Sequence, residues 1–117
     1  MTDASEATPP ELMYASQLFE STGVMQIVLR AGFTHENWPE LQEFCQTNLS
    51  NDAIHFWDLD LRQVPYINSM LLGLLVGFNA VILNRGAEFR LLVAKGSKTA
   101  EIIYFSKINR IINVRES

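Results

Sequence analysis

The chain has 117 residues, of which 48% are hydrophobic and 19% are charged, and its formal net charge is −4. This length and hydrophobic content fit one domain with a single core, and they exclude a wholly disordered chain. The nine lysines and arginines are scattered along the sequence, so it has no basic stripe of the kind that binds nucleic acid directly.

The elements are expected in the following order. Residues 12–19 and 24–33 are expected to form a strand hairpin around the turn residues Ser21, Thr22 and Gly23. Apolar residues at helical spacing predict a helix that begins after Thr34 and ends near Asn48. The later elements are a central strand over 53–61, an apolar helix over 69–84, a strand over 89–94, a helix over 100–107 and a short edge strand over 108–114.

This order predicts an α/β fold. Strands that alternate with helices imply crossover connections, and therefore a mostly parallel sheet of four to five strands with an antiparallel N-terminal hairpin and three to four helices. The helix over 69–84 is apolar on all sides, so we expect it to be covered by more than the sheet, with part of its surface meeting a partner. Gly73 and Gly77 on this helix are expected to admit close approach of a neighbouring backbone.

Three features concern compartment and membrane association. Cys45 is the only cysteine, which excludes an intramolecular disulfide and predicts a small buried side chain in a reducing, cytoplasmic compartment. Residues 1–11 are polar and acidic, unlike a signal peptide, and are expected to form a disordered leader before a domain over 12–117. The apolar run from Met70 to Phe78 is far shorter than the roughly 20 residues that a bilayer requires, so no membrane span is expected.

The segment from Asp60 to Gly77 carries a recognisable motif. It reads Asp-Leu-Arg-Gln-Val-Pro-Tyr-Ile-Asn-Ser-Met-Leu-Leu-Gly-Leu-Leu-Val-Gly. This run resembles the central motif of STAS domains, the family of anti-sigma factor antagonists. The resemblance extends from about Leu12 to the C-terminus, and the element order above fits the STAS fold.

The resemblance implies a regulatory binding protein rather than an enzyme, with no cofactor and no metal. In the family, a serine at the position of Ser69 is phosphorylated by an anti-sigma factor that is also a serine kinase, and a phosphatase reverses the modification. The unphosphorylated domain binds the anti-sigma factor, and the phosphorylated form releases it. The resemblance therefore implies a partner-binding surface made of Asn68, Ser69, Met70, Leu71, Leu74, His35 and Asp60.

The position of Ser69 also has a physical interpretation that needs no family. It lies at the expected amino end of a helix, where free N–H groups and the helix dipole favour an anion such as a phosphate. Two negative charges added beside apolar Met70 and Leu74 would oppose docking there. The alternative is an ordinary helix cap, because serine is among the best N-cap residues.

The chain departs from the family pattern at four positions. Asn68 stands where the family has aspartate, Met70 replaces a second hydroxyl residue, Leu71 replaces a glycine, and His35 lies where a loop acid is usual. These departures favour a second hypothesis, a scaffold or adaptor in a multiprotein assembly whose binding ignores Ser69. A third hypothesis is a small enzyme or nucleotide-binding protein that uses Asp58, Asp60 and Ser69. The sequence leaves a homodimer open.

Overall fold

The computed structural model describes residues 12–117. The leader expected over residues 1–11 lies outside the described part. The elements, in chain order, are β1 (Tyr14–Phe19), β2 (Val24–Leu29), η1 (His35–Asn37), α2 (Trp38–Asn48), β3 (Phe56–Asp60), α3 (Ser69–Asn84), β4 (Glu88–Val93), α4 (Lys98–Phe105), η2 (Ile108–Arg110) and β5 (Asn113–Glu116). The element order predicted from the sequence is therefore confirmed.

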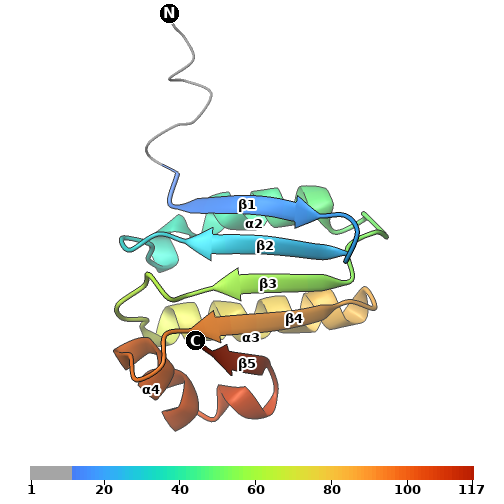
Figure 1. The fold of residues 1–117 in the computed structure, drawn as a ribbon. Helices are drawn as coiled ribbons and strands as arrows, with labels where there is room; N and C mark the ends of the chain where they lie inside the picture. Colours follow the sequence, from blue (N-terminus) through green and yellow to red (C-terminus); the bar gives the residue numbers. More distant parts are fainter. Residues whose placement is uncertain (1–11) are drawn as a thin grey trace, which may run out of the picture.

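The five strands form one sheet whose spatial order, β1-β2-β3-β4-β5, is the same as their order in the chain (Figure 1). β1 and β2 pair antiparallel, and the other three pairs are parallel. The hairpin turns at Gly23, whose φ of 71° lies in the left-handed region that favours glycine. The predicted mostly parallel sheet with an N-terminal antiparallel hairpin is confirmed.

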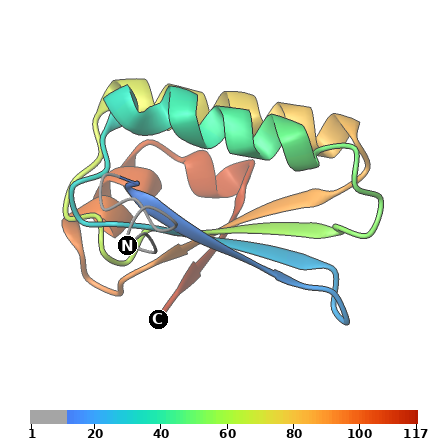
Figure 2. The same cartoon turned by 90° about the horizontal axis from the view of Figure 1, so that it is seen from above.

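Helices α2 and α3 cover one face of the sheet and leave the other face open (Figure 2). Side chains on β2 and β4 alternate between buried and half-buried along each strand, as expected when only one face of a sheet is covered. The parallel register places Gln26, Asp58 and Arg90 in one row across the open face. Helix α4 and η2 lie at the β5 edge of the molecule (Figure 1).

The core between α3 and the sheet centres on Phe78. Its ring makes edge-to-face contacts with Trp38 of α2, Trp57 of β3 and Phe89 of β4, at centroid distances of 5.8, 5.9 and 5.1 Å. Such geometry is favourable because the positive edge of one ring meets the negative face of another. These contacts join both covering helices to the two central strands and so fix the position of α3.

The edge strand predicted over residues 108–114 is wrong over residues 108–112. Residues Ile108–Arg110 form the single turn η2, and only Asn113–Glu116 form the strand. Lys107 adopts a left-handed conformation with φ of 66° after α4 ends, which turns the chain into η2. Ile108 and Ile112 are then buried four residues apart, a helical spacing rather than the two-residue spacing of a strand.

Candidate partner-docking site

The amino end of α3 is capped by Asn68, and this leaves Ser69 free. The side-chain oxygen of Asn68 accepts a hydrogen bond from the backbone N–H of Leu71 at 2.8 Å, and Asn68 has the extended backbone of an N-cap residue. Ser69 is the first residue of the helix, its side chain is exposed, and its hydroxyl makes no hydrogen bond with residues 12–117. The interpretation of Ser69 as the cap is therefore wrong, because the neighbouring asparagine has that role.

His35 holds the Asn68 amide in place from the other side of the loop. The Asn68 Nδ2 lies 3.0 Å from Nδ1 of His35. Since the amide oxygen is used by the Leu71 N–H, the Asn68 NH₂ group donates and Nδ1 of His35 accepts. His35 is itself positioned by a capping box in which Thr34 and Asn37 bond reciprocally. Two positions at which the chain departs from the family pattern thus form one hydrogen-bonded pair.

An exposed apolar patch lies beside Ser69. Tyr66 and Met70 are each 60% exposed, and Leu74, one turn further along α3, is half-buried. The whole helix carries no charged residue, and its first turn has no acidic side chain. The predicted apolar surface near the serine is therefore present, and Tyr66 belongs to it although the sequence did not single it out. The sequence signal for an exposed Tyr66 was its position: with Pro65 it lies between Val64 and Ile67, two apolar residues that anchor the loop.

Leu71 does not belong to this surface. Its side chain is 1% exposed and lies in the core with Leu75, which is 0% exposed. These two residues are four positions apart and share the buried face of α3. A partner that docks on the exposed side of the helix cannot contact Leu71.

Asp60 is also unavailable to a partner. It is 4% exposed, and its carboxylate accepts hydrogen bonds from the Arg62 backbone N–H at 2.9 Å and from the Arg62 guanidinium at 2.9 to 3.2 Å. These bonds to Asp60, together with its charge, hold the pKa of Arg62 above its usual value. Asp60 therefore stabilises the start of the loop that leads to Ser69, and a partner would meet Arg62 instead.

The loop between β3 and α3 is fixed at a second point by Thr99. The buried Thr99 hydroxyl donates a hydrogen bond of 2.7 Å to the carbonyl oxygen of Val64. Val64 and Ile67 are 1% and 2% exposed, so their side chains anchor the loop while Tyr66 stays outside. Ser97 caps α4, its hydroxyl oxygen accepting a hydrogen bond of 3.1 Å from the backbone N–H of Ala100. The loop is thus attached to the domain on both sides of Tyr66.

A groove of about 310 Å³ runs between α2 and α3 and adjoins the exposed apolar patch at Leu74. It is lined by Trp38, Gln42, Cys45, Gln46, Leu49, Gly73, Leu74, Gly77, Phe78 and Val81. A Cβ atom placed on Gly73 or Gly77 would meet nothing within 4 Å, so the predicted close packing of another backbone against these glycines is wrong. Both glycines instead keep the floor of the groove open.

Cys45 lies in the wall of this groove. It is 1% exposed, and burial raises the pKa of its thiol to about 12. The thiol therefore stays protonated and unreactive at neutral pH. The predicted small buried side chain is confirmed.

Replacing Gly77 with alanine is expected to raise the free energy of unfolding by about 0.5–1 kcal/mol, because glycine in a helix interior is costly and the added methyl group meets no neighbour. Chemical denaturation of the two proteins measures this difference. Gly86, with φ of 82°, is the matched control, since alanine there would be strained and destabilising. A loss of stability in the Gly77 variant would show that something does pack against this position.

The two carboxylates considered for acid–base chemistry are both engaged by arginines. Asp58 forms a paired hydrogen bond with Arg90 at 2.6 and 2.9 Å, and the Arg90 guanidinium stacks 4.1 Å from the ring centre of Phe56. Asp60 is held by Arg62. Within residues 12–117 no cluster of three or more histidine, cysteine, aspartate or glutamate side chains could hold a metal ion. Neither Asp58 nor Asp60 is therefore a free carboxylate.

Comparisons with known proteins agree with this architecture. The family model described as the STAS domain matches residues 16–117. The crystal structure of a candidate anti-sigma factor antagonist from Thermotoga maritima, TM1081, superposes with a TM-score of 0.75 at 19% identity, covering 90% of this chain and 87% of that one. The solution structure of TM1081 gives 0.74 at 18% identity, covering 100% and 91%. No curated protein gives a significant match.

The described helices can also be compared with the length and hydrophobicity that a membrane-spanning helix needs. None of them is both long enough and apolar enough to cross a bilayer. The family match covers most of the sequence, and the two solved structures share the same fold. The chain belongs to the STAS domain family.

Proposed function

We propose that this domain is an anti-sigma factor antagonist that docks through the amino end of α3, and that phosphorylation of Ser69 controls this docking. The observation that carries the proposal is the free, exposed Ser69 hydroxyl beside the exposed side chains of Tyr66 and Met70. A serine used as a cap would have its oxygen engaged by the helix backbone. Here Asn68 caps the helix, so a kinase can reach Ser69 without breaking a hydrogen bond of the fold.

The proposed partner is an anti-sigma factor that also acts as a serine kinase. A phosphate on Ser69 would lie at a helix amino end, where backbone N–H groups and the dipole stabilise an anion, so the domain would stay folded. The same phosphate would bring about two negative charges to the edge of an apolar contact. Phosphorylation would therefore release the partner, and a phosphatase would restore binding. Support for such a partner comes from family membership and from the structural similarity to TM1081.

The proposal is tested by incubating the domain with its cognate anti-sigma kinase and ATP, followed by intact-mass measurement and mapping of the modified peptide. We expect the mass of one phosphate, located on Ser69, and none on a Ser69→Ala variant. Ser50 and Ser106 are also exposed and serve as internal controls for unselective phosphorylation. Stable binding with no phosphate transfer, or transfer to another serine, would contradict the phosphorylation step.

A second function is favoured by Met70. In place of a second hydroxyl residue, this flexible apolar side chain is 60% exposed and enlarges the contact surface. Such a patch suits a scaffold or adaptor that docks whether or not Ser69 is charged. Equal binding by Ser69→Ala and Ser69→Asp variants would favour this second function over the first.

A further inference from the structure

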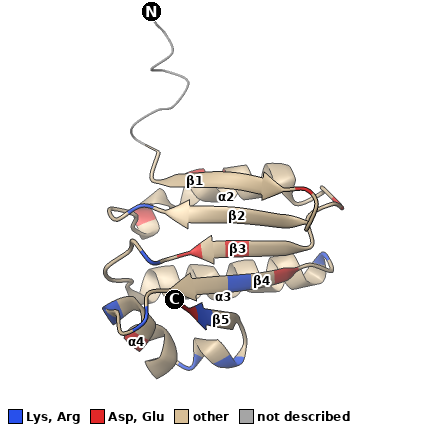
Figure 3. Ribbon diagram, viewed as in Figure 1, with Lys and Arg blue, Asp and Glu red and all other residues tan. Residues whose placement is uncertain are grey.

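The two ends of the molecule carry opposite charge. Residues 12–52 contain five acidic side chains and one basic side chain, whereas residues 95–117 contain five basic and two acidic side chains. Because the strands lie in the sheet in chain order, charges separated along the sequence are also separated in space. Figure 3 shows the result, with acidic residues at the α2 end and most basic residues at the end made of α4, η2 and β5, where acidic residues also occur on α4 and β5. We name β1 with α2 the acidic end, and α4 with η2 the basic end.

The basic end presents an exposed aromatic side chain. Phe105, the last residue of α4, is 90% exposed, and Ile111 after η2 is 56% exposed. Phe105 borders an open groove of about 520 Å³ that is also lined by Leu72, Glu101, Ile102 and Ser106. Lys107 and Arg110 form no ion pair within residues 12–117, whereas Lys98 is paired with Glu101 at 3.1 Å. The basic end is therefore an apolar surface bordered by uncompensated positive charge.

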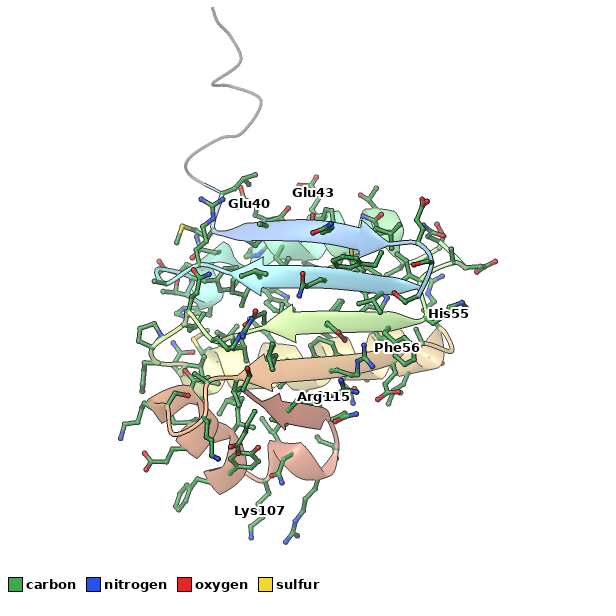
Figure 4. All side chains as sticks on the ribbon, in the orientation of Figure 1. Glu40, Glu43, His55, Phe56, Lys107 and Arg115 are labelled. Carbon is green, nitrogen blue, oxygen red and sulfur yellow. The ribbon has the colours of Figure 1, made fainter. Side chains whose placement is uncertain are left out.

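The acidic end has a matching composition. Tyr14 and Leu18 of β1 and Phe44 of α2 are half-buried, and the rings of Tyr14 and Phe44 lie 5.6 Å apart. Burial raises the pKa of Tyr14, and the nearby carboxylates of Glu40 and Glu43 raise it further. Both glutamates are exposed and form no ion pair with other described residues. In Figure 4, Glu40 and Glu43 lie beside β1, at the opposite end of the molecule from Lys107.

We propose that copies of this chain associate head to tail, with the Phe105 surface of one copy docking on the Tyr14 and Phe44 surface of the next. Opposite charges then meet around an apolar centre, which suppresses the wrong orientations as well as favouring the right one. A two-fold contact between two basic ends or two acidic ends would bring like charges together instead. A head-to-tail contact leaves one end free on each copy, so association continues beyond a dimer into a ring or an open array. The proposal does not depend on Ser69 or on an anti-sigma factor.

Two variants test it, each disabling one end. Phe105→Glu removes the exposed ring of the basic end, and the double variant Glu40→Lys with Glu43→Lys reverses the charge of the acidic end. All three positions are exposed, so both variants should keep the wild-type circular dichroism and melting temperature. Sedimentation velocity is measured over a series of protein concentrations at about 0.02 M and at about 0.5 M salt. At the higher salt concentration, charges more than about 3–10 Å apart are screened from one another.

We expect the wild-type protein to exceed the mass of a dimer at high concentration and low salt, and to dissociate at high salt. Each variant alone should be a monomer, and an equal mixture of the two should form a dimer and nothing larger, because one intact junction remains. A wild-type protein that stays monomeric at low salt would overturn the proposal. A mixture that stays monomeric would overturn it as well. So would association that persists in the variant with Glu40→Lys and Glu43→Lys and is lost only in Phe105→Glu, because that result would indicate a two-fold contact between basic ends.

Discussion

Replacing Ser69 with aspartate is expected to weaken binding of the anti-sigma factor by about 30-fold or more. The new carboxylate would lie at the edge of the contact made by Tyr66 and Met70, and placing a charge against apolar surface without a partner costs about 2 kcal/mol or more. Isothermal titration calorimetry measures the loss directly. The helix should remain folded, because an acidic side chain in the first turn is favourable to the dipole.

Two control variants distinguish an effect of the position of Ser69 from an effect of added negative charge. Ser69→Ala should bind as the wild-type domain does, since it adds no charge and the cap belongs to Asn68. Ser21→Asp adds the same charge in the exposed turn between β1 and β2 and should leave affinity unchanged. If the Ser21 variant weakened binding as much as the Ser69 variant, net charge would be responsible and the proposed site would be wrong.

Replacing Phe78 with alanine is expected to lower the free energy of unfolding by about 3–5 kcal/mol, the range for large-to-small changes in a core. Phe78 is 8% exposed and contacts Trp38, Trp57 and Phe89, so alanine would leave a cavity among three aromatic rings. Urea denaturation monitored by tryptophan fluorescence measures this change in the free energy of unfolding, because Trp38 and Trp57 both contact Phe78.

The matched control is Phe105→Ala, which removes the same ring from a position that is 90% exposed. Its effect should stay within about 0.5 kcal/mol, as for other surface substitutions. A loss below about 1 kcal/mol for Phe78→Ala would mean that α3 does not depend on this cluster for its position over the sheet.

The sequence predicted the elements well where the local signals were strong. The helix Ser69–Asn84 was predicted with both ends correct, since polar residues bound a long apolar run and a glycine follows it. The second strand was expected to continue to residue 33 but ends at Leu29. Phe33 is nevertheless buried, so the apolar pattern detected burial rather than strand pairing. The segment after Lys107 was mistaken for strand for the same reason.

The candidate site was harder to predict because α3 is apolar all round. An amphipathic helix shows which side faces solvent, whereas here Leu71 and Met70 looked alike although one is 1% and the other 60% exposed. The same lack of contrast concealed that Gly73 and Gly77 face outward. Only the position of the sheet separates these residues, and that position is set by contacts between distant segments, such as Phe78 with Phe89.

The hydrogen bonds of the site also joined residues that are far apart in the sequence. The pair His35 and Asn68 spans 33 residues, and the pair Val64 and Thr99 spans 35. The family resemblance implied that Asp60 faces a partner, but its carboxylate is held by Arg62, two residues away. Resemblance to the family points to the amino end of α3 as the candidate site. Which side chains are exposed there depends on contacts that one sequence does not reveal.

We propose that the amino end of α3 faces outward to bind another protein. Amide chemical-shift mapping of the isotopically labelled domain, titrated with the unlabelled anti-sigma factor, tests this directly. We expect the largest changes from Tyr66 to Leu74 and along the α2–α3 groove, with little change at Gln26 and Arg90 on the open face of the sheet. A footprint confined to the open face, with the signals around Ser69 unmoved, would contradict it.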